Sequence, residues 1–146
     1  MKRFSQFVCM ILVLATVLGT TAYAAEPMDS RASNYFASSS VYFWHVSGSQ
    51  YQIWFDVTAL GGMSELGASK IKVESSTDLV NWSPAGTYYK SGNPQMTTTS
   101  GTASYANYIP YTPTTGYAYR AIVTLYAKNS SGYGEMDTVT EILDLR

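Results

Sequence analysis

The sequence predicts an all-β protein: a single antiparallel sandwich of two sheets with about seven strands. The clearest observation lies in residues 116–134, where apolar and polar side chains alternate along a run rich in β-branched and aromatic residues. Such alternation sends one set of side chains to a core and the other to water. A second observation is that short strand-like segments recur between turn residues. No apolar pattern with the 3.6-residue helical period is present, which argues against a helical bundle.

The N-terminus has the three parts of a secretory signal peptide. Two basic residues open the chain, an almost unbroken apolar run covers residues 7–18, and the tripeptide Ala-Tyr-Ala ends at Ala24. We expect cleavage after Ala24, which would make the protein secreted and extracellular. The apolar run is shorter than the roughly 20 residues of a membrane-spanning helix. Under the alternative, an uncleaved anchor, the secreted protein would retain Met1.

Three parts of the chain follow from this pattern. Residues 1–24 are the signal peptide, residues 25–34 a polar, flexible lead-in, and residues 35–146 the β-sandwich domain. A domain of this size can bury a sizeable core. The only cysteine, Cys9, lies in the signal peptide. The mature chain therefore has no disulfide and no cysteine nucleophile.

Net charge argues against a nucleic-acid partner. The chain has nine basic and ten acidic residues; removal of the two basic residues of the signal peptide leaves seven basic against ten acidic, a net charge of −3. Nucleic-acid binding requires a basic surface to neutralise phosphates, and no basic patch is present. We also expect no membrane span in the mature chain, because no second long apolar segment follows.

The strands are expected from alternation and turn residues. Residues 51–60 place Tyr51, Ile53, Phe55 and Val57 on a core-facing side. Further strands are expected at residues 41–46, 69–75, 86–90, 96–108 (interrupted near Gly101), 117–128 and 133–143, with turns at residues 77–81 and 129–132.

Three positions carry more specific expectations. Residues 63–68 are ambiguous, with room for one short helical turn. Tyr117 belongs to the apolar face of its strand. Trp82, between a turn and a strand, is expected to be a core anchor, whose replacement by Ala would cost roughly 3–5 kcal/mol if it is fully buried.

Residues near the C-terminus carry a resemblance in architecture. Tyr119-Arg120-Ala121, followed by the turn at residues 129–132, is similar to the end of a fibronectin type III or immunoglobulin-like domain. In those domains a tyrosine opens the next-to-last strand and an Asn/Gly turn leads into the last one. The resemblance implies an immunoglobulin-like sandwich with Tyr119 as the residue of a tyrosine corner. Ala121 stands where an immunoglobulin domain would carry cysteine.

A second resemblance is carried by motifs in a fixed order. They include Arg31-Ala32-Ser33, Ile53-Trp54-Phe55-Asp56-Val57-Thr58, Leu66-Gly67-Ala68-Ser69, Trp82 and Tyr119-Arg120-Ala121. In these motifs the chain resembles a family of small secreted proteins of unknown function from Gram-positive bacteria, over most of residues 31–128. The resemblance implies a bacterial, extracellular protein and supplies no catalytic residue.

Catalysis has little support in the residues. His45 is the only histidine, so a Ser-His-Asp triad would have to use it, and no G-x-S-x-G motif is present. A histidine in an alternating strand is more often structural or exposed. We therefore expect no catalytic residue, no enzyme activity and no cofactor, and keep a hydrolase as the third hypothesis.

Metal binding is also expected to be absent. One histidine and no mature cysteine argue against zinc or copper. Calcium stays open through Asp78 with Asn81, or Glu135 with Asp137, because sandwich loops often supply such ligands. Neither pair matches a calcium-loop motif, and turn capping and solvated strands explain both.

Carbohydrate is the more specific ligand hypothesis. All three tryptophans and all but one of the 13 tyrosines follow the cleavage site. Exposed aromatic rings offer flat apolar faces to sugars, and nearby amides and carboxylates bond their hydroxyls. Gln52, Trp54 and Asp56 share one face of a strand, and we expect Trp44 on a neighbouring strand. Alternatively these aromatics only stabilise the sheet through cross-strand pairs. Under the ligand hypothesis Trp54→Ala abolishes binding and changes stability little.

The sequence thus predicts a non-catalytic extracellular binding module for a cell-envelope glycan or protein. The alternative is a structural or self-assembling matrix component. Residues 97–104 are flat, uncharged and rich in Thr and Ser. A strand of this kind at a sheet edge is open to self-association.

Overall fold

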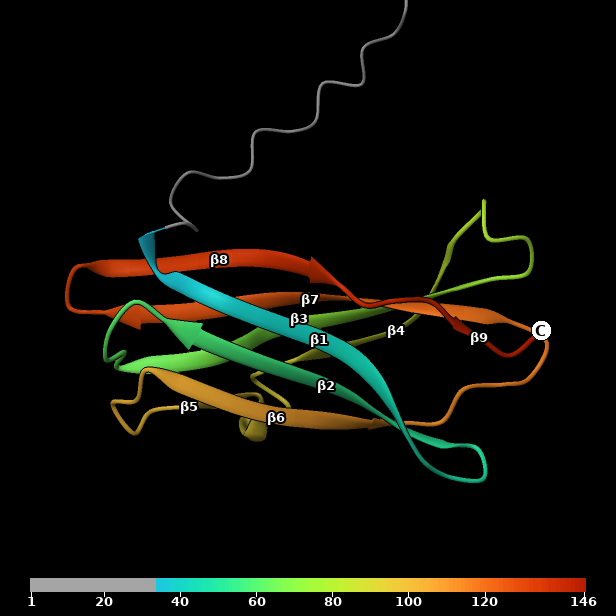
Figure 1. Cartoon of the computed structure of the whole chain (residues 1–146), viewed down its shortest axis with the longest axis horizontal. Coiled ribbons are helices and arrows are strands. Elements are labelled where there is room, and N and C mark those ends of the chain that lie inside the picture. The colour runs from blue at the N-terminus through green and yellow to red at the C-terminus, as the bar shows by residue number, and fades with distance from the viewer. Residues whose placement is uncertain (1–33) are drawn as a thin grey trace, which may run out of the picture.

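A computed structural model describes residues 34–146 (Figure 1). The predicted signal peptide and residues 25–33 of the predicted lead-in lie outside the described residues. The elements are β1 (Phe36–Ser47), β2 (Gln50–Ala59), β3 (Glu65–Ser76), β4 (Ser83–Tyr89), the 3-10 turn η2 (Pro94–Met96), β5 (Thr97–Thr98), β6 (Ser104–Tyr111), β7 (Ala118–Asn129), β8 (Gly132–Val139) and β9 (Leu143–Asp144).

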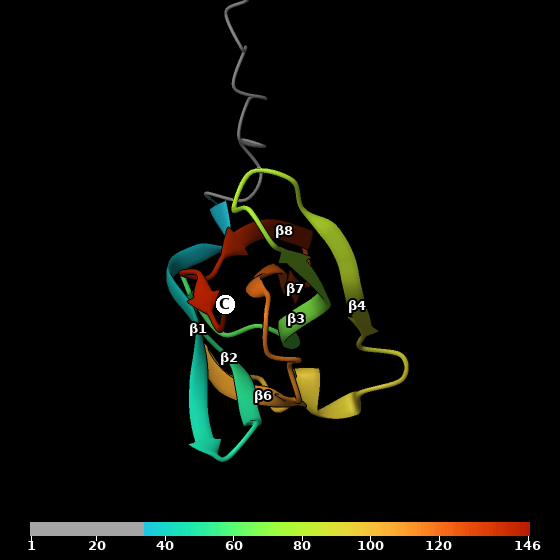
Figure 2. The ribbon, with the colours of Figure 1, turned by 90° about the vertical axis from the view of Figure 1, so that its right-hand side faces the viewer.

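The strands form two antiparallel sheets. One sheet has the order β1-β2-β6. The other has the order β4-β3-β7-β8, with β5 paired to β3 and β9 paired to β7. Seen end-on, the two sheets lie on opposite sides of the molecule (Figure 2). The predicted all-β, two-sheet antiparallel sandwich is confirmed.

Strand β7 is an inner strand of the second sheet and forms a hairpin with β8, the strand at one end of the order. β7 pairs with β3 on one side and β8 on the other, and the turn between Asn129 and Gly132 closes the hairpin. Asn129 stabilises this turn because its side-chain Oδ1 accepts a bond of 2.8 Å from the N–H of Ser131. The hairpin predicted for residues 116–134 is therefore present.

The core is made by the inward-facing residues of both sheets. Ile53, Phe55 and Val57 of β2 are fully buried, as are Val123 and Leu125 of β7. Full burial of a side chain of this size contributes roughly 1.5–3 kcal/mol. Because alternate residues of β2 are committed to this core, the residues between them must face outward.

Tyr119 forms a tyrosine corner, as the sequence predicts. Its side chain is buried, its hydroxyl donates to the carbonyl oxygen of Thr114 at 3.0 Å, and the N–H of Thr114 donates to the same hydroxyl at 3.0 Å. The ring also meets that of Tyr111 edge-on, with centroids 5.7 Å apart. These contacts fix the connection between β6 and β7, the position that such a tyrosine occupies in immunoglobulin-like sandwiches.

The short helical turn considered for residues 63–68 is wrong. Glu65 already belongs to β3, because that end of β3 pairs with β7 on one side and β5 on the other. Gly67 has a φ of 149° and lies directly against the backbone of Met96. Tertiary pairing overrides the weak local preference here.

The strand expected at residues 96–108 is interrupted near Gly101, but its halves lie in different sheets. β5 pairs with β3, whereas β6 pairs with β2. Gly101, with a φ of 73°, lies in the crossing between them. The break is therefore the point at which the chain changes sheets.

Two aromatic side chains lie outside the core in which the sequence places them. Tyr117 is 40% exposed because β7 begins one residue later. Trp82 precedes β4 and is half-buried on the outer side of the β4-β3-β7-β8 sheet, where Arg120 lies over its ring at 4.4 Å. The expectation that Trp82 is a core anchor is wrong, since the cation of Arg120 provides its packing partner on the surface.

Candidate functional site

The outer side of the β1-β2-β6 sheet carries four aromatic side chains, which we name the aromatic face: Tyr42, Trp44, Trp54 and Tyr108. Tyr42 and Trp44 come from β1, Trp54 from β2 and Tyr108 from β6. Trp54 faces outward because its neighbours Ile53 and Phe55 are buried.

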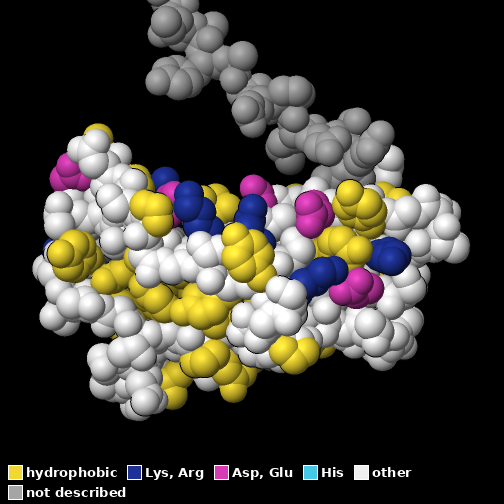
Figure 3. Space-filling model, turned by 180° about the vertical axis from the view of Figure 1, so that it is seen from behind, with side chains coloured by type: hydrophobic (Ala, Val, Ile, Leu, Met, Phe, Trp, Pro, Cys, Tyr) yellow, Lys and Arg dark blue, Asp and Glu magenta, His cyan; other side chains and the backbone are white. Residues whose placement is uncertain are grey.

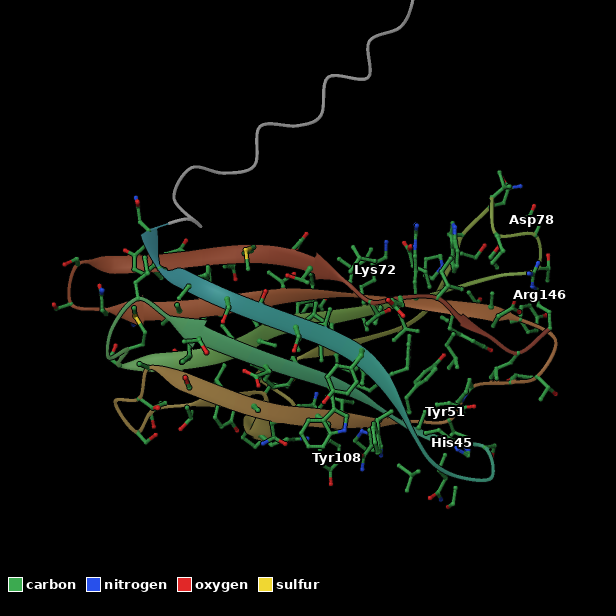
Figure 4. All side chains as sticks on the ribbon, in the orientation of Figure 1. His45, Tyr51, Lys72, Asp78, Tyr108 and Arg146 are labelled. Carbon is green, nitrogen blue, oxygen red and sulfur yellow. The ribbon has the colours of Figure 1, made fainter. Side chains whose placement is uncertain are left out.

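Three of these rings form a row across the three strands. In the register of the sheet Tyr42 is opposite Trp54, and Trp54 is opposite Tyr108. The rings of Tyr42 and Trp54 are nearly parallel, at 4°, with centroids 6.4 Å apart. The rings of Trp54 and Tyr108 are 5.0 Å apart and tilted by 37°. The row is therefore continuous from one edge of the sheet to the other, and Tyr108 is seen over β6 in Figure 4.

Gln52 holds the central ring of this row. The indole N–H of Trp54 donates to Oε1 of Gln52 at 2.8 Å. The bond uses the amide oxygen of Gln52, so its amide nitrogen is the part that can donate to a ligand. Trp44 lies opposite Gln52 in the adjacent row and is 58% exposed.

Asp56 lies on the same side of the sheet, next to the aromatic row. It is exposed, with Ser40 opposite on β1 and Ala106 opposite on β6. The structure thus brings Trp54, Gln52, Asp56 and Trp44 onto one surface, as the shared face of β2 and the neighbouring strand predicts.

A hollow adjoins the end of the aromatic face nearest the β1–β2 turn. It has a volume of about 180 Å³ and is lined by Val46, Gln50, Tyr51, Gln52, Pro110, Tyr111 and Thr112. Gln52 is shared between the hollow and the aromatic face. A ligand lying over Trp44 could therefore extend into this hollow.

Sequence reasoning missed Tyr42 and Tyr108. Tyr42 has the same parity along β1 as Trp44, so alternation alone was sufficient to place it. Tyr108 could not be found in this way, because its position depends on the register between β2 and β6, which are separated by 44 residues between Ala59 and Ser104.

His45 lies apart from the aromatic face. Its ring packs against Tyr51 with centroids 4.9 Å apart, and its Nε2 is 2.9 Å from the carbonyl oxygen of Gly48. Figure 4 shows His45 and Tyr51 together beside the β1–β2 turn. These contacts give His45 a structural role in the hairpin.

Asp78 caps a turn. Its Oδ1 accepts bonds from the N–H groups of Val80 and Asn81 at 2.9 and 2.8 Å, and its Oδ2 accepts from the Asn81 amide at 2.7 Å. The bond from the Asn81 backbone is the main cause of the lowered pKa of Asp78. The carboxylate is thus already used by the turn, in which Leu79 adopts a φ of 63°.

The second pair considered for calcium also has bonds within the sheet. Glu135 accepts a bond from Ser69 Oγ at 2.7 Å, and Asp137 accepts one from Thr124 Oγ1 at 2.6 Å. Within residues 34–146, no group of three or more His, Cys, Asp or Glu side chains is placed to hold a metal ion.

Charge is concentrated on the opposite face of the molecule. The Glu74 carboxylate lies 2.7 Å from Nζ of Lys72 and 2.7 Å from an Nη of Arg120. The hydrogen bond from Lys72 lowers the pKa of Glu74; Arg120 acts in the same direction, and burial opposes both. Figure 3 shows basic and acidic side chains side by side on this face.

The fold and the site define the protein as an all-β sandwich with an aromatic outer face on its three-stranded sheet. Comparison with protein-family models, curated proteins and solved structures finds no match to the chain. Among the described residues, no helix is long and apolar enough to cross a membrane.

Proposed function

We propose that the protein is an exported, non-catalytic binding module whose ligand is an extracellular glycan held on the aromatic face. The observation that carries the proposal is the continuous row Tyr42–Trp54–Tyr108, with the exposed Trp44 beside it. The export of the protein rests on the signal peptide expected in residues 1–24.

The geometry of the row suits a chain of sugars. Neighbouring strands are about 4.8 Å apart, which is close to the length of one sugar ring in an extended chain. A glycan lying across the strands would meet one aromatic ring on each strand and stack its apolar face there. The amide nitrogen of Gln52 and the carboxylate of Asp56 lie beside the row to bond ring hydroxyls.

A protein partner or self-assembly is the competing proposal. Trp44 and Val46 of β1 are 58% and 48% exposed, and β1 pairs on one side only, so it forms an edge of its sheet. Exposed apolar side chains at a sheet edge suit contact with another chain. This proposal predicts oligomers that grow with protein concentration in the absence of any glycan.

Binding to the envelope of the producing cells tests the proposal. The purified exported protein should co-sediment with the envelope, and this retention should be lost after enzymatic degradation of the glycan. Trp44→Ala should weaken retention by about fivefold or more, because loss of an interfacial tryptophan commonly costs more than about 1 kcal/mol and about 1.4 kcal/mol is a factor of ten.

Trp82→Ala provides the matched control. It removes the same type of side chain from the opposite sheet, where Trp82 packs under Arg120. Retention by this variant should equal that of the unchanged protein. Absence of retention on the envelope both before and after glycan degradation, or equal losses in both variants, would rule out a glycan on the aromatic face and favour a diffusible protein-binding or self-assembling role.

A further inference from the structure

The three strands that carry the aromatic face are almost free of charge. β1 and β6 contain no Lys, Arg, Asp or Glu, and β2 contains only Asp56. The surface that would meet a ligand therefore has aromatic rings, hydroxyls and one amide, with a single negative charge at its margin. No Lys or Arg of residues 34–146 lies on it.

The cations of residues 34–146 lie elsewhere. Lys70 and Lys72 belong to β3, Arg120 and Lys128 to β7, Lys90 follows β4 and Arg146 ends the chain. Four of the six are also held by carboxylates. The ion pairs are Lys72–Glu74 (2.7 Å), Arg120–Glu74 (2.7 Å), Lys90–Glu65 (2.9 Å) and Arg146–Asp144 (2.7 Å).

This separation of charge determines which glycans suit the aromatic face. Polymers with phosphate, carboxylate or sulfate groups are bound through Arg or Lys, which offer charge-assisted hydrogen bonds. On the aromatic face such a polymer would find no cation and would approach Asp56, whose like charge repels it. An uncharged sugar chain needs only stacking surfaces and hydrogen bonds, which this face provides.

We propose that the aromatic face selects an uncharged glycan and discriminates against anionic polysaccharides, with Asp56 as the residue that sets the discrimination. This inference rests on the proposed function and adds the chemical class of the ligand. It also implies that binding depends little on ionic strength, because salt screens charge pairs and leaves stacking contacts nearly unchanged.

Matched pairs of polysaccharides test the inference. Cellulose, chitin and a mixed-linkage glucan are each compared with their carboxymethylated forms as ligands of the full exported protein. At least one neutral polymer should bind at least tenfold more tightly than its carboxymethylated form at low salt. Removal of phosphate-linked polymers from the envelope should leave retention equal or increased.

Two carboxylate variants make the test specific. Asp56→Asn should lower the ratio of neutral to carboxymethylated affinity several-fold, because the repelling charge is gone. Any change in its neutral binding reports the hydrogen bond that the Asp56 carboxylate makes to ring hydroxyls, and is measured separately. Glu141→Gln removes the charge of another exposed carboxylate, which follows β8, and should change neither the affinity ratio nor the neutral binding. Raised salt should bring the affinities of the unchanged protein for the neutral and the carboxymethylated polymer closer together, because salt screens the repulsion. The same two affinities of the Asp56→Asn protein should respond little to salt.

The outcomes separate this inference from the proposed function. Charge selection is wrong, and glycan binding stands, in either of two cases. In the first, the protein binds the anionic polymer as tightly as the neutral one. In the second, Asp56→Asn leaves the ratio of the two affinities unchanged. If no polymer and no envelope glycan is retained, the proposed function and the inference both fail.

Discussion

Trp54 occupies the centre of the aromatic face and serves two purposes at once. Its ring contacts Tyr42 on one side and Tyr108 on the other, and its N–H is bonded to Gln52. A side chain held in this way is fixed in orientation, which favours ligand binding because little rotamer entropy remains to be lost. The same contacts stabilise the sheet, so Trp54 cannot report on binding alone.

Replacement of Trp54 by Ala should therefore lower the free energy of unfolding as well as binding. Two aromatic pairs are lost, each of about 0.5–1.5 kcal/mol, so we expect a total of about 1–3 kcal/mol. This revises the expectation from sequence that Trp54→Ala changes stability little. Chemical denaturation followed by far-UV circular dichroism measures the loss.

Trp44 is the matched control for that measurement. It is 58% exposed, and its replacement by Ala should change the free energy of unfolding by no more than about 0.5 kcal/mol. Equal stabilities of the Trp54→Ala and Trp44→Ala proteins would contradict the packing described for the row.

At the scale of the element, β3 depends on a glycine that the sequence does not mark as special. Gly67 has a φ of 149°, and a Cβ placed there would collide with the carbonyl oxygen of Met96 and lie 2.8 Å from Cα of Thr97. Both atoms are backbone, so neither can move without shifting η2 and β5. The absence of a side chain is what allows this segment to lie against β3.

Gly67→Ala should destabilise the protein by at least about 2 kcal/mol, from backbone strain and overpacking together. Gly86→Ala in β4 is the control, because the nearest atom to its added Cβ is 3.9 Å away, on the side chain of Tyr88. The melting temperatures of the two variants give the comparison. A Gly67→Ala protein as stable as Gly86→Ala would show that the close approach to Met96 is not required.

At the scale of the whole molecule, the two outer faces differ in chemistry. One is aromatic and nearly uncharged. The other has ion pairs around Glu74, of which the pair with Lys72 lies within β3 and the pair with Arg120 links β3 to β7. Glu74 is itself 7% exposed, so its charge is stabilised mainly by its partners. The acid sensitivity of the fold should therefore arise partly on the charged face.

The pKa of Glu74 is lowered in the folded protein, chiefly by its bond to Lys72. A group with a lowered folded pKa contributes stability above its unfolded value, and this contribution is lost as pH falls through the folded value. The ordinary glutamate pKa is about 4.3, so the contribution is complete at neutral pH and decreases below about pH 4.3.

Glu74→Gln should accordingly be less stable than the unchanged protein at pH 7, and the difference should shrink as pH falls below about 4.3. Urea denaturation at a series of pH values measures it. Glu141→Gln, an exposed carboxylate after β8, should give no such pH-dependent difference. If Glu74→Gln lowers the free energy of unfolding by the same amount from neutral to acid pH, the loss of stability does not come from the ion pairs of Glu74.

Local patterns in the sequence determined the class of fold and most of the elements. Alternation placed Ile53 and Phe55 in the core and turned Trp54 outward, because side chains on a strand point to opposite faces whatever the partner strand is. The turn at residues 129–132 could also be predicted, since it depends on residues close in sequence. The tyrosine corner at Tyr119 was implied by the resemblance to immunoglobulin-like domains and is also made by residues close in sequence.

Only the tertiary structure decided what depends on register and on the contacts between distant segments. It set Tyr108 beside Trp54, moved Trp82 from an expected core position to a surface contact with Arg120, and divided residues 96–108 between two sheets. Strand pairing is specified by the packing of whole faces, and no local pattern encodes which strand becomes the neighbour. The aromatic face, the candidate site, is the product of that pairing.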